Sequence, residues 1–345
     1  ASDLIPTRTS SGTLTVDGDD NNPTINIGSD FFYSGTVTVI SGSGTWTVAG
    51  GFDASGSAVF TATSGNTISL TSAGGGDLVD MGSNSLYNLT FAGSGQIDTS
   101  NSWTIGNDLT ITSGSMRQLG ATLTVGGHFT NNATYTFTGT PTILMSGTSK
   151  NITGSSTTSF YNLTINPSTT GTITVAAGGS DITATNTLNI AAGDTLSIGT
   201  GRTATHTGAT LTWGDSASTI SGAGTLRFTD VSGGPSTGGT LSSVVRYDMT
   251  AGNIASTTFD ARTYGGKVEV YTNSVTGRTA NMASGTYTLS GASSHFHMVC
   301  ANSGDMEVDA QTGNPTVNIG GDLDYIVAGC SGANILLPGS GTWTV

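Results

Sequence analysis

The chain is a succession of short runs in which an apolar residue alternates with threonine, serine or asparagine. Such runs include TLTV at 13–16, TVTV at 36–39 and TLSI at 195–198. A period of two places the apolar side chains on one face of a strand. Turn pairs such as Ser-Gly and Gly-Asp separate the runs, and we find no apolar stripe with the period of a helix. The pattern therefore predicts an all-β fold.

The spacing of the runs narrows the fold class. The runs recur roughly every 8–12 residues and predict about thirty short strands, which is too many for one sandwich. We predict an irregular β-solenoid, β-helix-like, in which each coil brings two or three strands around a shared core. An echo supports this architecture, because SLYNLTF at 85–91 returns as SFYNLTI at 159–165.

The opening of the chain recurs at its end. Residues 11–28 return in related form as 303–320, shifted by 292 positions, and GSGTWTV at 42–48 returns at 339–345, shifted by 297. The copies are therefore related units rather than identical ones. We predict a β-solenoid over 1–235, with a candidate linker in the glycine-rich stretch 233–239. Residues 236–345 continue the solenoid or form a second β domain, within which 303–345 repeats the unit 11–48.

Composition excludes several classes of partner. The net charge is −13, from 22 acids and 9 bases, and only 9% of residues are charged. No basic stripe with interleaved aromatic residues is present, so we expect no nucleic acid partner. No apolar run of about 18 residues is present, so we expect no membrane span. An acidic, hydroxyl-rich surface favours an extracellular or cell-surface location.

The two cysteines, Cys300 and Cys330, leave two alternatives open. They form one disulfide in an oxidising compartment, or they are two buried thiols. The opening sequence ASDLIPTRTS is consistent with a mature N-terminus produced by cleavage of a signal peptide.

Two groups of residues are weak candidates for metal binding. Asp17, Asp19 and Asp20 offer hard oxygen ligands to Ca²⁺, but they lack the spacing of an EF-hand, and a solvated turn is the favoured alternative. His295 and His297 share one face of a strand and would form half of a metal site, against the plainer alternative of half-exposed strand histidines. We predict no other cofactor.

The acidic residues near the end of the chain raise the question of catalysis. Asp305, Glu307 and Asp309 alternate along one strand, as do Asp322 and Asp324. A glycoside-cleaving β-helix needs a carboxylate pair in a groove. Solvated faces, or a bridging cation, explain the same pattern. No nucleophile elbow or phosphate loop is present, so we predict no catalytic residue and a protein that is not an enzyme.

Four Asn-x-Ser/Thr sequons are candidates for glycosylation: Asn88, Asn132, Asn151 and Asn162. Chance occurrence in a threonine-rich chain is the alternative, and for the repeated Asn88 and Asn162 an inward asparagine ladder competes. The four tryptophans, Trp46, Trp103, Trp213 and Trp343, stand at apolar positions of the runs, which favours core packing over stacking on sugars.

Short segments such as Thr-Leu-Thr-Val recur along the chain together with glycine-rich segments such as Ser-Gly-Gly, and Tyr-Asn-Leu-Thr occurs twice. This pattern resembles the secreted, repeat-rich β-solenoid surface proteins of prokaryotes, which include adhesins, sheath proteins and extracellular filament proteins. The resemblance implies an extracellular, non-enzymatic, structural role.

Three functions follow in order of preference. The first is a structural subunit of an extracellular filament, sheath or surface layer, in which copies of the chain assemble head to tail through unpaired end strands. The second is a cell-surface adhesin or carbohydrate-binding stalk whose partners are surface glycans. The third is a β-helix polysaccharide-degrading enzyme, which the scarcity of glutamate, lysine and arginine disfavours.

Overall fold

A computed structural model describes residues 4–6, 14–33, 36–56, 59–229, 232–236, 238–291, 294–327 and 333–345. These residues form 40 short strands and no helix, and parallel strands stack as a β-solenoid of about 14 turns. The predicted fold class is therefore confirmed. The strands outnumber the predicted total of about thirty, because several corners carry strands of two residues that leave no alternating pattern in the sequence.

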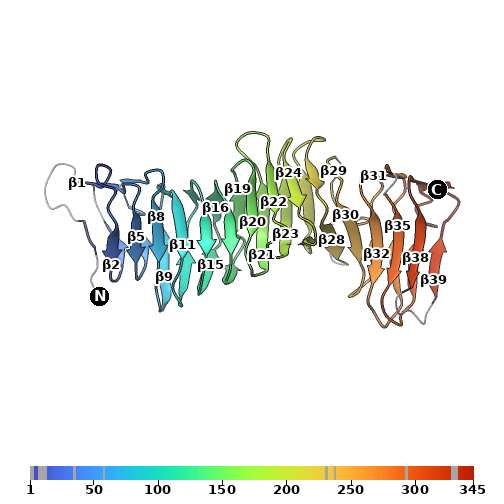
Figure 1. Cartoon of the computed structure of the whole chain (residues 1–345). Helices are drawn as coiled ribbons and strands as arrows, with labels where there is room; N and C mark the ends of the chain where they lie inside the picture. The colour runs from blue at the N-terminus through green and yellow to red at the C-terminus, as the bar shows by residue number, and fades with distance from the viewer. Residues whose placement is uncertain are drawn as a thin grey trace. The chain divides into compact units, whose positions relative to one another are not determined.

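The chain divides into two compact units, residues 1–173 with 178–180 and residues 174–177 with 181–345. The glycine-rich stretch 233–239 lies within the second unit. We describe each unit by itself; in Figure 1 the first runs from blue to green and the second from green to red.

The first unit contains four parallel sheets (Figure 1). One consists of β1 (Leu14–Asp17), β4 (Val37–Ile40) and β7 (Val59–Thr61). The second consists of β2 (Ile25–Ile27), β5 (Thr45–Val48), β8 (Thr67–Leu70), β11 (Asn88–Phe91), β14 (Leu109–Ile111), β17 (Phe129–Asn131) and β20 (Lys150–Thr153). The third consists of β3 (Phe31–Phe32), β6 (Phe52–Asp53), β9 (Gly75–Asp80), β12 (Gln96–Thr99), β15 (Ser115–Leu119) and β18 (Thr134–Thr138). The fourth consists of β10 (Ser85–Leu86), β13 (Trp103–Ile105), β16 (Thr122–Val125), β19 (Thr142–Met145) and β21 (Thr158–Ile165).

Strand β22 (Thr172–Val175) lies where the two units divide. One sheet of the second unit consists of β24 (Thr195–Ile198), β27 (Thr219–Ser221), β29 (Thr240–Leu241), β31 (Thr263–Tyr264), β34 (Thr286–Leu289), β37 (Thr316–Ile319) and β40 (Trp343–Thr344). A small sheet consists of β33 (Arg278–Asn281), β36 (Met306–Asp309) and β39 (Asn334–Leu337). The long-strand sheet consists of β23 (Ile182–Ile190), β25 (Thr203–His206), β28 (Thr225–Thr229), β30 (Val244–Asp248), β32 (Val268–Thr272), β35 (Phe296–Cys300) and β38 (Leu323–Val327), with β26 (Thr210–Trp213) also paired to β23.

The core lies inside the coils because the alternating runs turn their apolar residues inward. In the first unit Leu89 stacks on Leu109 and Phe91 on Ile111, and all four side chains are buried. Each fully buried side chain of this kind contributes about 1.5–3 kcal/mol. The intervening threonines point outward, so each sheet presents a hydroxyl-rich outer face.

Candidate functional site

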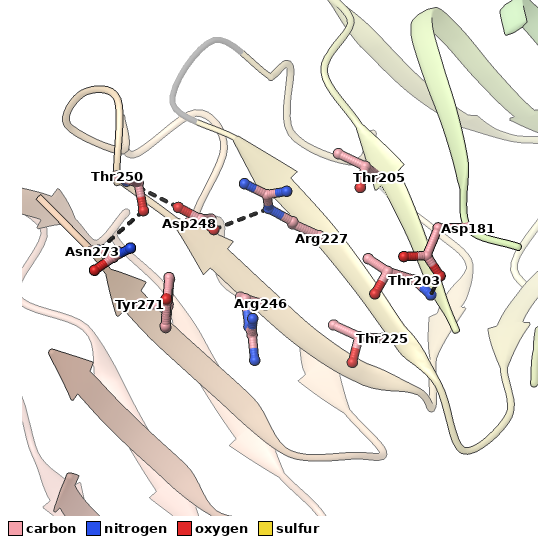
Figure 2. Close-up of a pocket in the computed structure, with 10 residues that line it drawn as sticks. All are labelled: Asp181, Thr203, Thr205, Thr225, Arg227, Arg246, Asp248, Thr250, Tyr271 and Asn273. Carbon is pink, nitrogen blue, oxygen red and sulfur yellow. Dashed lines mark hydrogen bonds and ion pairs between the residues drawn. The ribbon is translucent and has the colours of Figure 1, made fainter. Parts of the chain in front are cut away.

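A polar groove of about 330 Å³ lies on the outer face of the long-strand sheet in the second unit. Figure 2 shows its lining, which comes from strands β25, β28, β30 and β32 and their flanking turns. Four of the lining residues are threonines, which face outward because their apolar neighbours face the core: Thr203, Thr205, Thr225 and Thr250.

Two arginines dominate the groove. Arg227 on β28 and Arg246 on β30 are register partners, and Glu269 on β32 follows in the same cross-strand row. Arg227 Nε lies 3.0 Å from Asp248 Oδ2, and Arg246 Nη2 lies 2.8 Å from Glu269 Oε2. Figure 2 shows both arginines on adjacent strands, with Asp248 beside Arg227 and Tyr271 beside Arg246.

The burial of these ion pairs is unequal. The side chains of Arg227 and Arg246 are 38% and 35% exposed, whereas those of Asp248 and Glu269 are 5% and 9% exposed. The carboxylates therefore lie beneath the guanidinium groups. Burial alone would raise the pKa of Glu269, but its contacts with Lys267 and Arg246 lower that pKa below its usual value, so Glu269 is charged at neutral pH.

His297 of the predicted histidine pair continues the same row, as the register partner of Glu269. His295 and His297 lie side by side, with ring centroids 5.4 Å apart. His297 Nε2 lies 3.2 Å from Asp324 Oδ2, and His295 Nδ1 lies 3.3 Å from Asp322 Oδ2. Burial, aided by the charge of Lys267, lowers the pKa of His297. The structure thus brings together the predicted histidines and one of the predicted acidic groups, as two separate His–Asp pairs.

Two residues of the calcium candidate, Asp17 and Asp19, make hydrogen bonds within the protein. Asp17 Oδ1 accepts a hydrogen bond from the backbone N–H of Asp19 at 2.9 Å, and Asp19 Oδ1 accepts one from Thr63 Oγ1 at 2.9 Å. Asp20 lies in the exposed turn that follows. Among the described residues no group of three or more His, Cys, Asp or Glu side chains is arranged to hold a metal ion. A Ca²⁺ titration would test the site directly.

The acidic residues of β36 lie on its outer face. Glu307 and Asp309 alternate with buried Met306 and Val308, as the pattern predicts. Their neighbours in register on β33 are Thr279 and Asn281, both uncharged. Asp305 precedes the strand and accepts the backbone N–H of Ala333 at 2.7 Å. This arrangement matches a solvated face.

The sequons differ in exposure. Asn132 is exposed, whereas Asn88, Asn151 and Asn162 are half-buried. Asn88 and Asn162 lie on outer faces, where each bonds a threonine of the preceding coil, so neither forms an inward ladder. Whether any sequon is glycosylated stays a prediction.

The tryptophans and the cysteines differ in burial. Trp46 and Trp103 are buried, as expected for core residues, whereas Trp213 and Trp343 are half-buried. Cys300 is buried at the end of β35. Cys330 lies outside the described residues, so the disulfide stays a prediction.

The two copies of the recurring unit have the same local structure. Ile25 of β2 pairs with Trp46 of β5, and the equivalent Val317 of β37 pairs with Trp343 of β40. In both copies an asparagine with φ of 44°, Asn22 or Asn314, accepts a backbone N–H across the coil at 2.7 Å. The sequence repeat is therefore a structural repeat.

The two copies differ in how their strands are paired. Among the described residues β2 pairs only with β5, but its equivalent β37 pairs with both β34 and β40. Likewise β40 pairs only with β37, but its equivalent β5 pairs with both β2 and β8. The same holds for β1, whose equivalent β36 has two partners, and for β39, whose equivalent β4 has two partners.

Comparison with known proteins assigns no family. No protein-family model matches the chain, and no curated protein or solved structure is significantly similar to it. The part of the chain that the structure describes holds no helix able to cross a lipid bilayer.

Sequence reasoning missed the arginine groove. A usable signal exists, because Arg227 in TLRFT and Arg246 in VVRYD take the same polar position in successive alternating runs. Two charges at equivalent positions of neighbouring coils lie side by side on one face of a parallel stack.

Proposed function

We propose that this chain is a structural subunit of an extracellular filament, sheath or surface layer, and that copies associate head to tail through their end strands. The observation that supports this proposal is the unequal pairing of the recurring unit. Each end strand with one partner has an equivalent, elsewhere in the same chain, that has partners on both edges. Among the described residues, the end strands thus have the same local structure as strands that are paired on both edges, which supports pairing on their second edge.

Physical chemistry favours a second copy as the partner. An open strand edge presents unpaired N–H and C=O groups, and soluble β proteins usually protect such edges with lysine, proline or a bulge. Strand β39, with the sequence NILL, carries none of these residues. Apolar side chains on the core-facing side of their strands are exposed at both ends: Val16 at one, whose equivalent Val308 is buried, and Tyr325 at the other, whose equivalent Tyr33 is buried. Stacking one end on the other would bury them, at about 25 cal/mol per Å² of apolar surface.

The symmetry of such a contact determines the assembly. Two different surfaces meet, so the contact is heterologous, and heterologous contacts that do not close into a ring produce filaments. The net charge of −13 makes two copies repel one another at long range, so head-to-tail association should strengthen as salt screens that repulsion.

The test is a lysine substitution on the open edge. In Ile335→Lys a charge replaces a side chain that is 37% exposed on the outer face of β39, so the subunit should still fold, but a lysine on an edge strand opposes pairing with a second chain. The matched control is Val275→Lys, at a 67% exposed position outside the strands. We expect concentration-dependent association of the parent chain and of Val275→Lys in sedimentation velocity, filaments in negative-stain micrographs, and monomers for Ile335→Lys. A parent chain that stays monomeric at high concentration, or association unchanged in Ile335→Lys, overturns the proposal.

A second candidate, a surface adhesin that binds carbohydrate, is favoured by the polar groove on the long-strand sheet. Its lining of threonine, arginine and tyrosine side chains offers hydrogen-bond donors and acceptors with an aromatic ring, which are the groups that bind sugars.

A further inference from the structure

Basic residues are scarce in this chain but gather at the groove. The whole chain contains nine lysines and arginines and 22 acidic residues. Four of the nine lie in or directly before four successive strands of the long-strand sheet: Arg202, Arg227, Arg246 and Lys267. Basic residues are thus concentrated in this part of the sheet, although the chain as a whole is acidic.

The way the charges are layered leaves both guanidinium groups of the lining at the surface, while the exposed carboxylate of Asp181 accepts the backbone N–H of Thr203 and lies 3.8 Å from Arg202 Nη1. The partners Asp248 and Glu269 are almost fully buried, whereas Arg227 and Arg246 keep more than a third of their side chains exposed. A guanidinium group carries five N–H donors, so a single carboxylate partner leaves donors for a ligand. The two groups stand on neighbouring strands, about 4.8 Å apart, at a spacing that one anionic group can bridge.

The rest of the lining favours a sugar as the carrier of that anionic group. Thr203, Thr205 and Thr225 offer hydroxyls along one side, and Tyr271 offers a ring on the other, with the Arg246 guanidinium 4.7 Å from its centroid. The groove crosses several strands and holds about 330 Å³. A hydroxylated, extended, negatively charged ligand meets all of these features.

We infer that this groove binds an acidic polysaccharide, whose carboxylate or sulfate groups pair with Arg227 and Arg246 while its hydroxyls contact the threonine row. The inference does not depend on self-assembly, because the groove lies on the outer face of the sheet and not on the open strand edges. Binding should weaken as salt rises, since exposed charge pairs are screened at high ionic strength.

The sharpest test introduces a competing carboxylate. Thr205 is the register partner of Arg227, and it is half-buried on the outer face. In Thr205→Glu the new carboxylate can pair with Arg227 inside the protein, so the fold should be retained while the ligand is displaced. The matched control is Thr124→Glu, at a half-buried outer position in the first unit whose register neighbours are Thr104 and Leu144, both uncharged.

The probes are oligogalacturonate, a sulfated oligosaccharide, a neutral dextran oligomer and single-stranded DNA, each titrated calorimetrically against the full chain. We expect one or both acidic sugars to bind and dextran not to bind. We expect the affinity to fall about tenfold or more in Thr205→Glu, with no change in Thr124→Glu. Thermal unfolding of each variant verifies the fold.

Three results overturn the inference. They are failure of both acidic sugars to bind, equal affinity of the parent chain and Thr205→Glu, or equal binding of DNA, which would show a general attraction for polyanions. None of them bears on the head-to-tail proposal, whose test uses Ile335→Lys.

Discussion

Trp46 and Trp343 occupy the same position in two copies of one coil, but Trp46 is 1% exposed and Trp343 is half-buried. In both copies the indole N–H donates to a backbone carbonyl five residues earlier, that of Ser41 or Pro338. The difference lies in the neighbours. Ile68 of β8 covers Trp46, whereas β40 has a described partner on one edge only.

The two tryptophans should therefore differ in their contribution to stability. Trp46→Ala leaves a cavity in the core and should lower the free energy of unfolding by about 3–5 kcal/mol. Trp343→Ala removes a side chain that is partly hydrated already and should cost no more than about 2 kcal/mol. Urea unfolding of dilute protein measures both values. Equal losses would contradict the difference in packing.

The asparagine at the corner of the recurring coil should tolerate glycine better than alanine. Asn22 has φ of 44°, a region that costs L-residues with a Cβ about 1–2 kcal/mol, and its side chain accepts the N–H of Ser43. Asn22→Ala should cost about 2 kcal/mol, from strain and the lost hydrogen bond. Asn22→Gly should cost about 1 kcal/mol, from the hydrogen bond alone. The same order is expected at Asn314, and thermal unfolding of the four variants measures it.

His206 should make the second unit sensitive to acid. Its side chain is fully buried against Phe228, and burial lowers its pKa from 6.5 to about 4, against a smaller opposing effect of the Ala184 carbonyl. A lowered folded-state pKa means that stability is present above pH 6.5 and is lost as the pH falls toward 4. Between pH 7 and pH 5 the loss should be about 2 kcal/mol.

The substitution His206→Leu should remove this loss. We expect the difference in unfolding free energy between the variant and the parent chain to move in favour of the variant as the pH falls from about 7 to 5. His297→Gln is the comparison: burial lowers the pKa of His297 too, but Asp324 beside it opposes the lowering, so we expect a change in the same direction and of smaller size. A constant difference for His206→Leu across this range would show that the imidazole is protonated in the fold without cost.

The sequence pattern was sufficient to predict the architecture, but it did not predict which residues are neighbours in space. Alternation with threonine predicted parallel-stacked strands and the inward tryptophans Trp46 and Trp103, because a period of two leaves one face for the core. It did not predict which strands meet. Arg227, Arg246 and Glu269 lie in one cross-strand row, but 19 and 23 residues separate them, so coil lengths vary and register cannot be counted from spacing.

Local motifs were also weaker guides than their similarity suggested. Asn88 and Asn162 lie in nearly identical sequence segments, but Asn88 belongs to the sheet that contains β8 and Asn162 to the sheet that contains β19. Nearly the same sequence segment therefore occurs in two different sheets of the solenoid. Likewise His295 and His297 offered no sign of their partners Asp322 and Asp324, because those residues lie one coil further along the chain.

The matched register of the two recurring units has a consequence for how such a chain can change in length. Residue 28 stands at the same place in its copy as residue 320 in the other, and β2 pairs with β5 in the same register as β37 with β40. A genetic exchange between the two copies would add or delete about 292 residues and would leave an unchanged seam. The length of such a chain can thus change by inheritance in whole repeat units. Every remaining strand then keeps the same kind of neighbour.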